Sequence, residues 1–173
     1  MIKKLIIITI TITIFLLTGC NSTEVTERAF VKAIYVDKSE GNIYLDILYT
    51  TPEGEEKIFV SKGKDFSSAI TLTKNTIGKD IFTDHCEIIF VGAGITDIKK
   101  DLSYLSESRA FPFKMIICKC AYKDVLSAKN IDSFGDIVSE EKGSDYGTLF
   151  AVFSDKNEEY PIATLREGYI ILL

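Results

Sequence analysis

The chain has 173 residues, with 20 basic and 25 acidic side chains and a net charge of −5 at neutral pH. This length suits one domain or two small ones, and a hydrophobic content of 46% is enough for a core, which excludes a disordered body. The negative charge argues against nucleic acid as a partner and against charge-driven binding to a lipid surface.

The first 20 residues have the pattern of a bacterial export signal. Lys3 and Lys4 precede an apolar stretch from residue 5 to residue 17, and small residues lead to Cys20. The sequence Leu17-Thr18-Gly19-Cys20 resembles a bacterial lipobox. In such a motif the signal peptidase cuts directly before the cysteine, which becomes the new N-terminal residue. We therefore expect lipidation of Cys20, with palmitate among the acyl chains, and a protein anchored on the extracytoplasmic face of the cell membrane.

A transmembrane helix is the alternative for this segment. It would need about 20 apolar residues, whereas the stretch from 5 to 17 is shorter and is diluted by Thr9, Thr11 and Thr13. The favoured division is a signal peptide at 1–19, a membrane tether at 20–28 and a domain at 29–173. Without the signal, which holds two lysines and no acidic residue, the net charge is −7.

The predicted elements begin with strands. Apolar and polar residues alternate over 29–37 and 43–50, and the turn residues between these runs predict a β-hairpin. A third strand follows at 56–61. The period then changes, and a helix is predicted over 66–77, capped by Asp65 and ended by Gly78.

Strands and helices alternate in the rest of the chain. A buried strand at 87–91 is followed by a helix with Thr96 or Asp97 as its cap, which carries Ile98, Leu102 and Leu105 at helical spacing. The remaining predictions are a strand at 113–121, helices at 124–129, 133–139 and 143–153, and a strand at 168–173. This order predicts an α+β (mixed α/β) fold with one main mixed β-sheet, an N-terminal β-hairpin and flanking helices.

Cys86, Cys118 and Cys120 remain once Cys20 is assigned to lipid, an odd number for an exported chain. Cys118 and Cys120 lie two apart on a predicted strand and therefore share a face. A metal site formed with His85 is conceivable, but the spacing is not that of a zinc knuckle, and small apolar core residues are the favoured interpretation.

Other motifs are weak. Ser61-Lys62-Gly63-Lys64 fits the Ser-x-x-Lys nucleophile motif without its partner motifs, and Gly92-Ala93-Gly94 lacks the third glycine of a phosphate-binding loop and suits a tight turn. His85 is the only histidine and thus the only candidate histidine base.

Two pairs of adjacent acidic residues, Glu140-Glu141 and Glu158-Glu159, fit a solvated surface better than paired-carboxylate catalysis. We predict no catalytic residue, no metal ligand and no cofactor, and we expect a protein that is not an enzyme.

The order of these segments resembles the N-terminal region of the Ger(x)C family of spore germination lipoproteins. The segments that carry the resemblance are the lipobox Cys20, Glu27-Arg28, the strand Val31–Asp37, the helix 69–77, His85 before the strand 87–92, the helix from Ile98 to Arg109, and Ala121 with Asp124-Val125-Leu126. It extends from about residue 17 to about residue 173. Asn21 departs from the family, which usually has an aromatic residue after the lipidated cysteine.

The resemblance implies an accessory C subunit of a spore nutrient germinant receptor, on the outer face of the spore inner membrane. The implied partners are membrane-embedded A-like and B-like subunits, and only Cys20 transfers as a functional position. Family members continue through a second large region, so the 173 residues correspond to about half of such a protein. An unrelated extracytoplasmic ligand-binding lipoprotein and a small exported enzyme with His85 as base stay open as alternatives.

Overall fold

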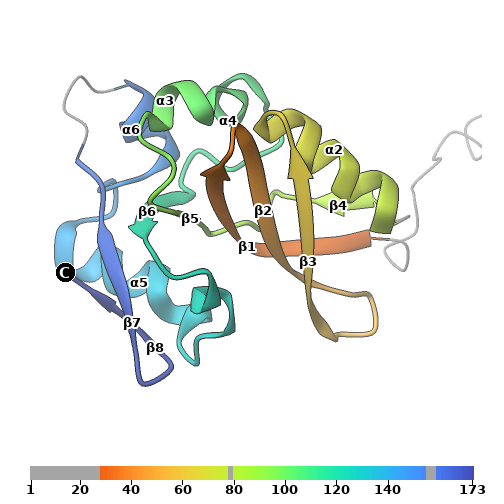
Figure 1. Ribbon diagram of the computed structural model, residues 1–173. Coiled ribbons are helices and arrows are strands. Elements are labelled where there is room, and N and C mark those ends of the chain that lie inside the picture. Colours follow the sequence, from red (N-terminus) through yellow and green to blue (C-terminus); the bar gives the residue numbers. More distant parts are fainter. Residues whose placement is uncertain (1–27, 78–79, 155–158) are drawn as a thin grey trace, which may run out of the picture.

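The computed structural model describes residues 28–77, 80–154 and 159–173 (Figure 1). The predicted signal, Cys20, nearly all of the tether, Gly78 and Glu158 lie outside the described residues. Within them, eight strands form one mixed sheet in the order β3-β2-β1-β5-β6-β7-β8, with β4 paired to β1. The predicted fold class, α+β with one main mixed sheet, is confirmed.

The predicted hairpin forms one half of the sheet. Strand β1 (Arg28–Ser39) pairs antiparallel with β2 (Asn42–Thr50), which pairs antiparallel with β3 (Glu56–Gly63). Glu40 and Gly41 join β1 to β2 with φ values of 51° and 75°. Two positive φ values are typical of the tight turns whose twist matches that of a hairpin.

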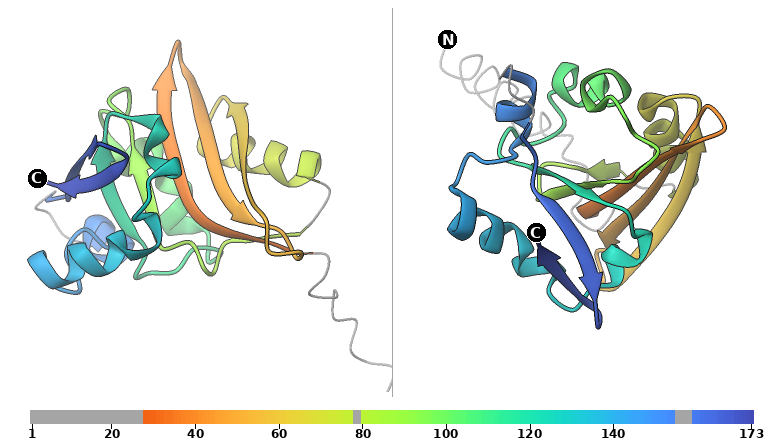
Figure 2. Two further views of the ribbon diagram at one scale, coloured as in Figure 1. Left: turned by 90° about the horizontal axis from the view of Figure 1, so that it is seen from below. Right: turned by 60° about the vertical axis from the view of Figure 1, so that its left-hand side comes forward.

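Parallel strands form the other half. β1 pairs in parallel with β4 (Asp80–Phe82) through its first residues and with β5 (Ile88–Val91) further along. β5 pairs with β6 (Ile116–Cys120), and β6 with β7 (Ile162–Arg166). The antiparallel strand β8 (Tyr169–Leu172) closes this side, so β3 and β8 are the two edges (Figure 2).

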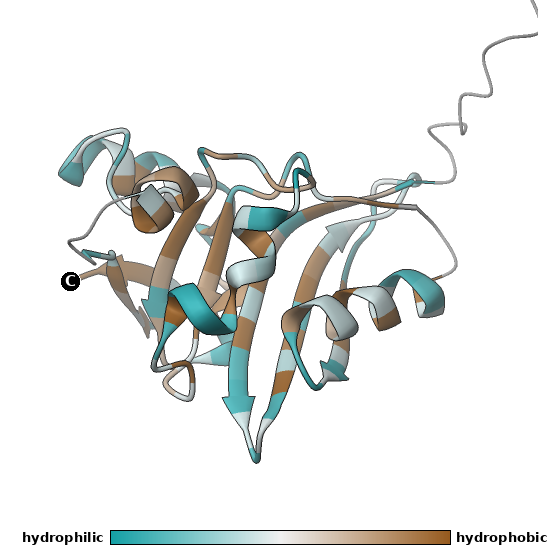
Figure 3. Ribbon diagram, turned by 90° about the horizontal axis from the view of Figure 1, so that it is seen from above, coloured by the Kyte–Doolittle hydropathy of each residue, from teal (hydrophilic) through white to brown (hydrophobic). Residues whose placement is uncertain are grey.

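Helices cover both faces of the sheet. The buried residues of α2 (Phe66–Ile77), α3 (Ile98–Asp101), α4 (Ser103–Glu107) and α6 (Leu149–Ser154) pack on one face. The other face carries the 3-10 helix η2 (Lys123–Ser127) and α5 (Phe134–Lys142), joined by η3 (Ile131–Ser133). Alternating residues of β1, β5 and β6 therefore enter two separate cores. Figure 3 shows the hydrophobic residues along these strands and the helices beside them. None of the helices in the described ranges is long and apolar enough to cross a bilayer.

Two predicted helix caps are confirmed. Asp65 accepts a hydrogen bond from the Ser68 amide at 2.7 Å, and the Asp65 amide donates to the Ser68 hydroxyl at 3.1 Å. Asp97 accepts from the Lys100 amide at 3.0 Å, which selects Asp97 over Thr96 as the cap of α3. Each cap satisfies an amide that the first helical turn leaves without a partner.

Several predicted boundaries are wrong. The helix after Asp97 is interrupted at Leu102, and the short helix predicted at 124–129 is the 3-10 helix η2, which ends at Ser127. Residues 143–148 form turns instead of the start of a helix, because Gly143 and Gly147 have φ values of 102° and 70°.

The strands of the second half differ from the prediction as well. β6 begins at Ile116 instead of residue 113, because residues 112–115 form a turn in which the Met115 amide donates to the Pro112 carbonyl at 3.0 Å. β4 and β7 are not predicted. Strand β4 has only three residues, and β7 has no continuous apolar face, since Ile162 is exposed and Ala163 is small.

Candidate functional site

The carboxyl ends of the parallel strands β1, β5, β6 and β7 meet at one end of the sheet, where ligands bind in many open α/β sheets. Two open pockets lie there, one on each side of Ala121. The β5–β7 pocket has a volume of about 580 Å³ and the β1–β3 pocket about 460 Å³.

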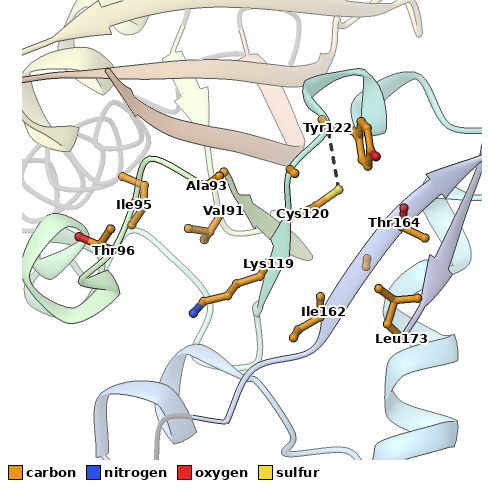
Figure 4. A pocket seen from close by; sticks show the side chains of 13 residues that line it. Val91, Ala93, Ile95, Thr96, Lys119, Cys120, Tyr122, Ile162, Thr164 and Leu173 are labelled. Carbon is orange, nitrogen blue, oxygen red and sulfur yellow. Dashed lines mark hydrogen bonds between the residues drawn. The ribbon is translucent and has the colours of Figure 1, made fainter. Parts of the chain in front are cut away.

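The β5–β7 pocket lies between the loop after β5 and the β7–β8 hairpin (Figure 4). Its walls are mainly apolar, and Lys119 supplies the charged side chain. The Lys119 ammonium lies 4.8 Å from the centre of the Tyr160 ring, a cation–π distance. The labelled lining residues in Figure 4 are Val91, Ala93, Ile95, Thr96, Lys119, Cys120, Tyr122, Ile162, Thr164 and Leu173.

The β1–β3 pocket is more polar. It is lined by Tyr35, Asp37, Ser39, Tyr44, Asp46, Val60, Ala121 and Lys123. Burial raises the pKa of Asp46, while the charge of Lys123 acts in the opposite direction. Burial also raises the pKa of Tyr35, so its hydroxyl stays a neutral donor.

Asp37 holds the end of β1 against the turn after β5. Its Oδ1 atom accepts hydrogen bonds from the amides of Lys38 and Gly94, both at 2.8 Å, and the Tyr35 hydroxyl donates to Oδ2 at 3.4 Å. A Cβ atom on Gly92 would overlap the Asp37 carboxylate, and one on Gly94 would overlap the Lys38 carbonyl oxygen. The two glycines are therefore required by this close approach of two chain segments.

This arrangement explains Gly92-Ala93-Gly94 without a phosphate. The Ile95 amide donates to the Gly92 carbonyl at 3.3 Å, and the Gly94 amide is already bonded to Asp37. A carboxylate at the centre of the turn would repel a phosphate. The predicted tight turn is confirmed, and next to it Lys38 forms an ion pair at 2.6 Å with Asp101 of α3.

Cys86, Cys118 and Cys120 are buried free thiols, as the core interpretation predicts. Burial raises the pKa of Cys86 to about 12 and also raises those of Cys118 and Cys120, so these thiols stay protonated and poorly nucleophilic. His85 precedes β5, whereas Cys120 ends β6, so they lie at opposite ends of the sheet. Among the described residues, no three potential metal ligands come together.

The other candidate residues either support the packing of the fold or lie on its surface. Ser61 is buried, and its hydroxyl accepts a hydrogen bond at 3.0 Å from Thr73 of α2, which ties β3 to that helix. His85 is exposed and lies against the rings of Phe30 and Phe82, at centroid distances of 5.8 and 6.4 Å. Glu140, Glu141 and Glu159 are exposed.

Tyr35, Tyr44, Asp46 and Lys123 are pocket residues that the sequence analysis does not single out. The sequence does contain a pattern that could have indicated Tyr35, Tyr44 and Asp46, because polar residues recur at every second position in these parts of β1 and β2. Residues 35 and 37 share a face of β1, and residues 44 and 46 lie opposite them on β2. The approach of Lys123 from η2 depends on tertiary packing and leaves no such pattern.

Comparison with known protein families gives a match over most of the sequence. The family model of the spore germination protein N-terminal domain matches residues 21–141, from just after Cys20 into α5. This match is shorter than the predicted extent of about 17 to 173. Neither curated proteins nor solved structures gave a match. Because the matched segment covers more than half of the sequence, the chain belongs to the family of spore germination proteins that carry this N-terminal domain.

Proposed function

We propose that the protein is a lipid-anchored accessory subunit of a spore nutrient germinant receptor and acts by protein–protein interaction at the membrane surface. The observation that carries the proposal is the start of the family match at residue 21, directly after the cysteine of the lipobox. Membership of the family fits a spore membrane-associated protein.

The described site supports interaction over catalysis. The Asp37 carboxylate is held by backbone amides, the thiols are buried, and the Ser61 hydroxyl lies inside the packing of α2 on β3. These groups serve the packing and hydrogen bonding of the fold. We propose that the protein has no catalytic activity and that its partners are membrane-embedded A-like and B-like receptor subunits.

Cross-linking in intact dormant spores tests this proposal. A tagged protein with Cys20 is expected to co-purify with A-like and B-like subunits from the solubilised inner membrane, and the Cys20→Ala variant is expected to lose both subunits. Recovery of the wild-type protein in that membrane without either subunit would contradict the interaction role.

Ligand binding is the second candidate, and the β1–β3 pocket is the observation that favours it. Asp46 and Lys123 place opposite charges beside the rings of Tyr35 and Tyr44, an arrangement able to orient a small polar molecule. An Asp46→Asn variant separates the two functions in a germination assay. A shift in the half-maximal nutrient concentration would support ligand binding, whereas an unchanged value supports the interaction role.

A further inference from the structure

Two exposed aromatic residues, on segments joined by a backbone hydrogen bond, lie at the end of the sheet opposite the two pockets. Phe113 and Phe150 are each 64% exposed. The Phe150 amide, in the first turn of α6, donates a hydrogen bond to the Phe113 carbonyl at 3.1 Å. Leaving two phenyl rings in water forgoes the stabilisation that burial of each would give, which makes this pair a candidate contact surface.

Phe113 and Lys114 occupy the two corner positions of the turn that precedes β6. Gly, Asn, Asp and Ser are usual at such corners, so phenylalanine is not explained by the turn itself. Met115 on the next position is buried in the core, which fixes the base of the turn. The turn therefore presents an aromatic ring and a lysine from a rigid support.

The chain enters the domain at this same end of the sheet. Ala33 of β1 is in register with Ile88 of β5, and Ile88 with Ile116 of β6. Arg28 precedes Ala33, and Phe113 precedes Ile116, so both lie on the amino-terminal side of the parallel strands. Tyr122, which follows β6 and is 53% exposed, lies at the opposite end.

The lipid attachment site is close to this end along the chain. Cys20 lies eight residues before Arg28, a distance of at most about 30 Å when the chain is fully extended. A lipid on Cys20 would keep the amino-terminal end of the sheet within reach of the bilayer surface, while the two pockets lie at the other end.

We propose that Phe113 and Phe150 form a second membrane contact, inserting into the interface of the bilayer that holds the lipid on Cys20; this rests on the proposed lipid anchor. Insertion is driven by burial of the two rings, and the Lys114 stem extends its ammonium toward lipid phosphates. The contact does not require a basic surface and is compatible with the net charge of −7 after signal removal. It would direct the Asp37 end of the sheet away from the bilayer.

A protein partner fits this patch less well than lipid. Stable protein interfaces bury about 800 Å² on each partner, which far exceeds what two phenylalanine side chains expose. An anchored protein needs only a small additional contact, since the lipid already holds it at the surface.

Single-tryptophan reporters test the proposal, because the chain has no tryptophan. Phe113→Trp, Phe150→Trp and, as the matched control, Tyr122→Trp are prepared as full lipidated proteins. Each is reconstituted into phosphatidylcholine vesicles that contain lipids brominated at shallow acyl positions. We expect the tryptophan emission of the Phe113→Trp and Phe150→Trp variants to be largely lost in brominated vesicles, with emission of the Tyr122→Trp variant unchanged.

Three outcomes would overturn the proposal. If the protein binds the vesicles but neither the Phe113→Trp nor the Phe150→Trp variant is quenched, the proposed lipid contact is ruled out. The lipid anchor and the proposed function would remain intact. Equal quenching of the Tyr122→Trp control means that the domain has no fixed orientation on the bilayer. Failure of the processed protein to remain with the vesicles would remove the anchor, and both proposals would fall.

Discussion

The Asp37 carboxylate joins two segments that are 57 residues apart in the chain, since one oxygen accepts from both Lys38 and Gly94. In the Asp37→Ala variant these amides lose their shared acceptor, and we expect a loss of about 1–3 kcal/mol in the free energy of unfolding. Asp37→Asn keeps an oxygen at the same position and should lose less. Urea denaturation of the purified variants measures both values, and equal losses would contradict the role of the oxygen.

A substitution at Gly94 tests the close approach of β1 to the turn after β5 by steric means. In Gly94→Ala the new Cβ would overlap the Lys38 carbonyl oxygen, so the backbone must move, at a cost of about 1–3 kcal/mol. Gly135→Ala is the matched control, since its Cβ would meet only Ile116 at 3.8 Å. Alanine in a helix such as α5 should be neutral or stabilising by up to about 1 kcal/mol. Thermal unfolding that ranks the two variants in the reverse order would exclude the close approach.

Among the secondary-structure elements, α2 is stabilised by its Asp65 cap to an extent that depends on pH. Hydrogen bonds from Ser68 hold the pKa of Asp65 below its usual value of 3.8. Because the pKa is lowered in the folded state, the stabilisation is present above that usual value and is lost as pH falls through the folded value. Asp65→Ala should cost about 1 kcal/mol at neutral pH and less at low pH.

Asp65→Asn is the control for this pH dependence, because asparagine caps a helix without titrating. Stability curves of the wild type and Asp65→Asn should agree at neutral pH and diverge under acid conditions. Parallel curves over the whole range would contradict the assigned role of the carboxylate.

The Asn130 side chain helps to attach the β7–β8 hairpin to the segment after η2. The Asn130 amide group donates to the Ile170 carbonyl at 3.0 Å, and its oxygen accepts from the Ile170 amide at 2.8 Å. We expect Asn130→Ala to expose these two backbone groups, to destabilise the protein by about 1–3 kcal/mol and to speed amide exchange in β8 first. Uniform protection of β8 in the variant, measured by hydrogen exchange, would contradict this attachment.

These elements differ in how well the sequence predicts them. The first hairpin, α2 and the caps at Asp65 and Asp97 follow from local patterns, and the structure confirms them. β7 does not, because Ile162 and Ala163 give no apolar alternation, and its pairing with β6 depends on residues far away in the chain. Asp46 and Lys123 likewise form one pocket only after η2 packs on the sheet.

At the scale of the whole molecule, the sheet has two ends with different properties. The end at which β1 begins carries Phe113 and Phe150. The other end carries the hydrogen bonds of Asp37 to the turn after β5, together with the β5–β7 and β1–β3 pockets. With lipid on Cys20, the first end would face the bilayer. The second would then be available to the extracytoplasmic parts of membrane-embedded subunits.

Fractionation of dormant spores and growing cells, followed by detection with an antibody to this protein, tests whether it is a lipid-anchored protein of the spore inner membrane. We expect recovery in the spore inner membrane with release only by detergent, and we expect Cys20→Ala to move the protein to the soluble fraction. Recovery only in growing-cell membranes would contradict the germination role while retaining the lipid anchor. Membrane retention of the Cys20→Ala protein after signal removal would contradict the anchor.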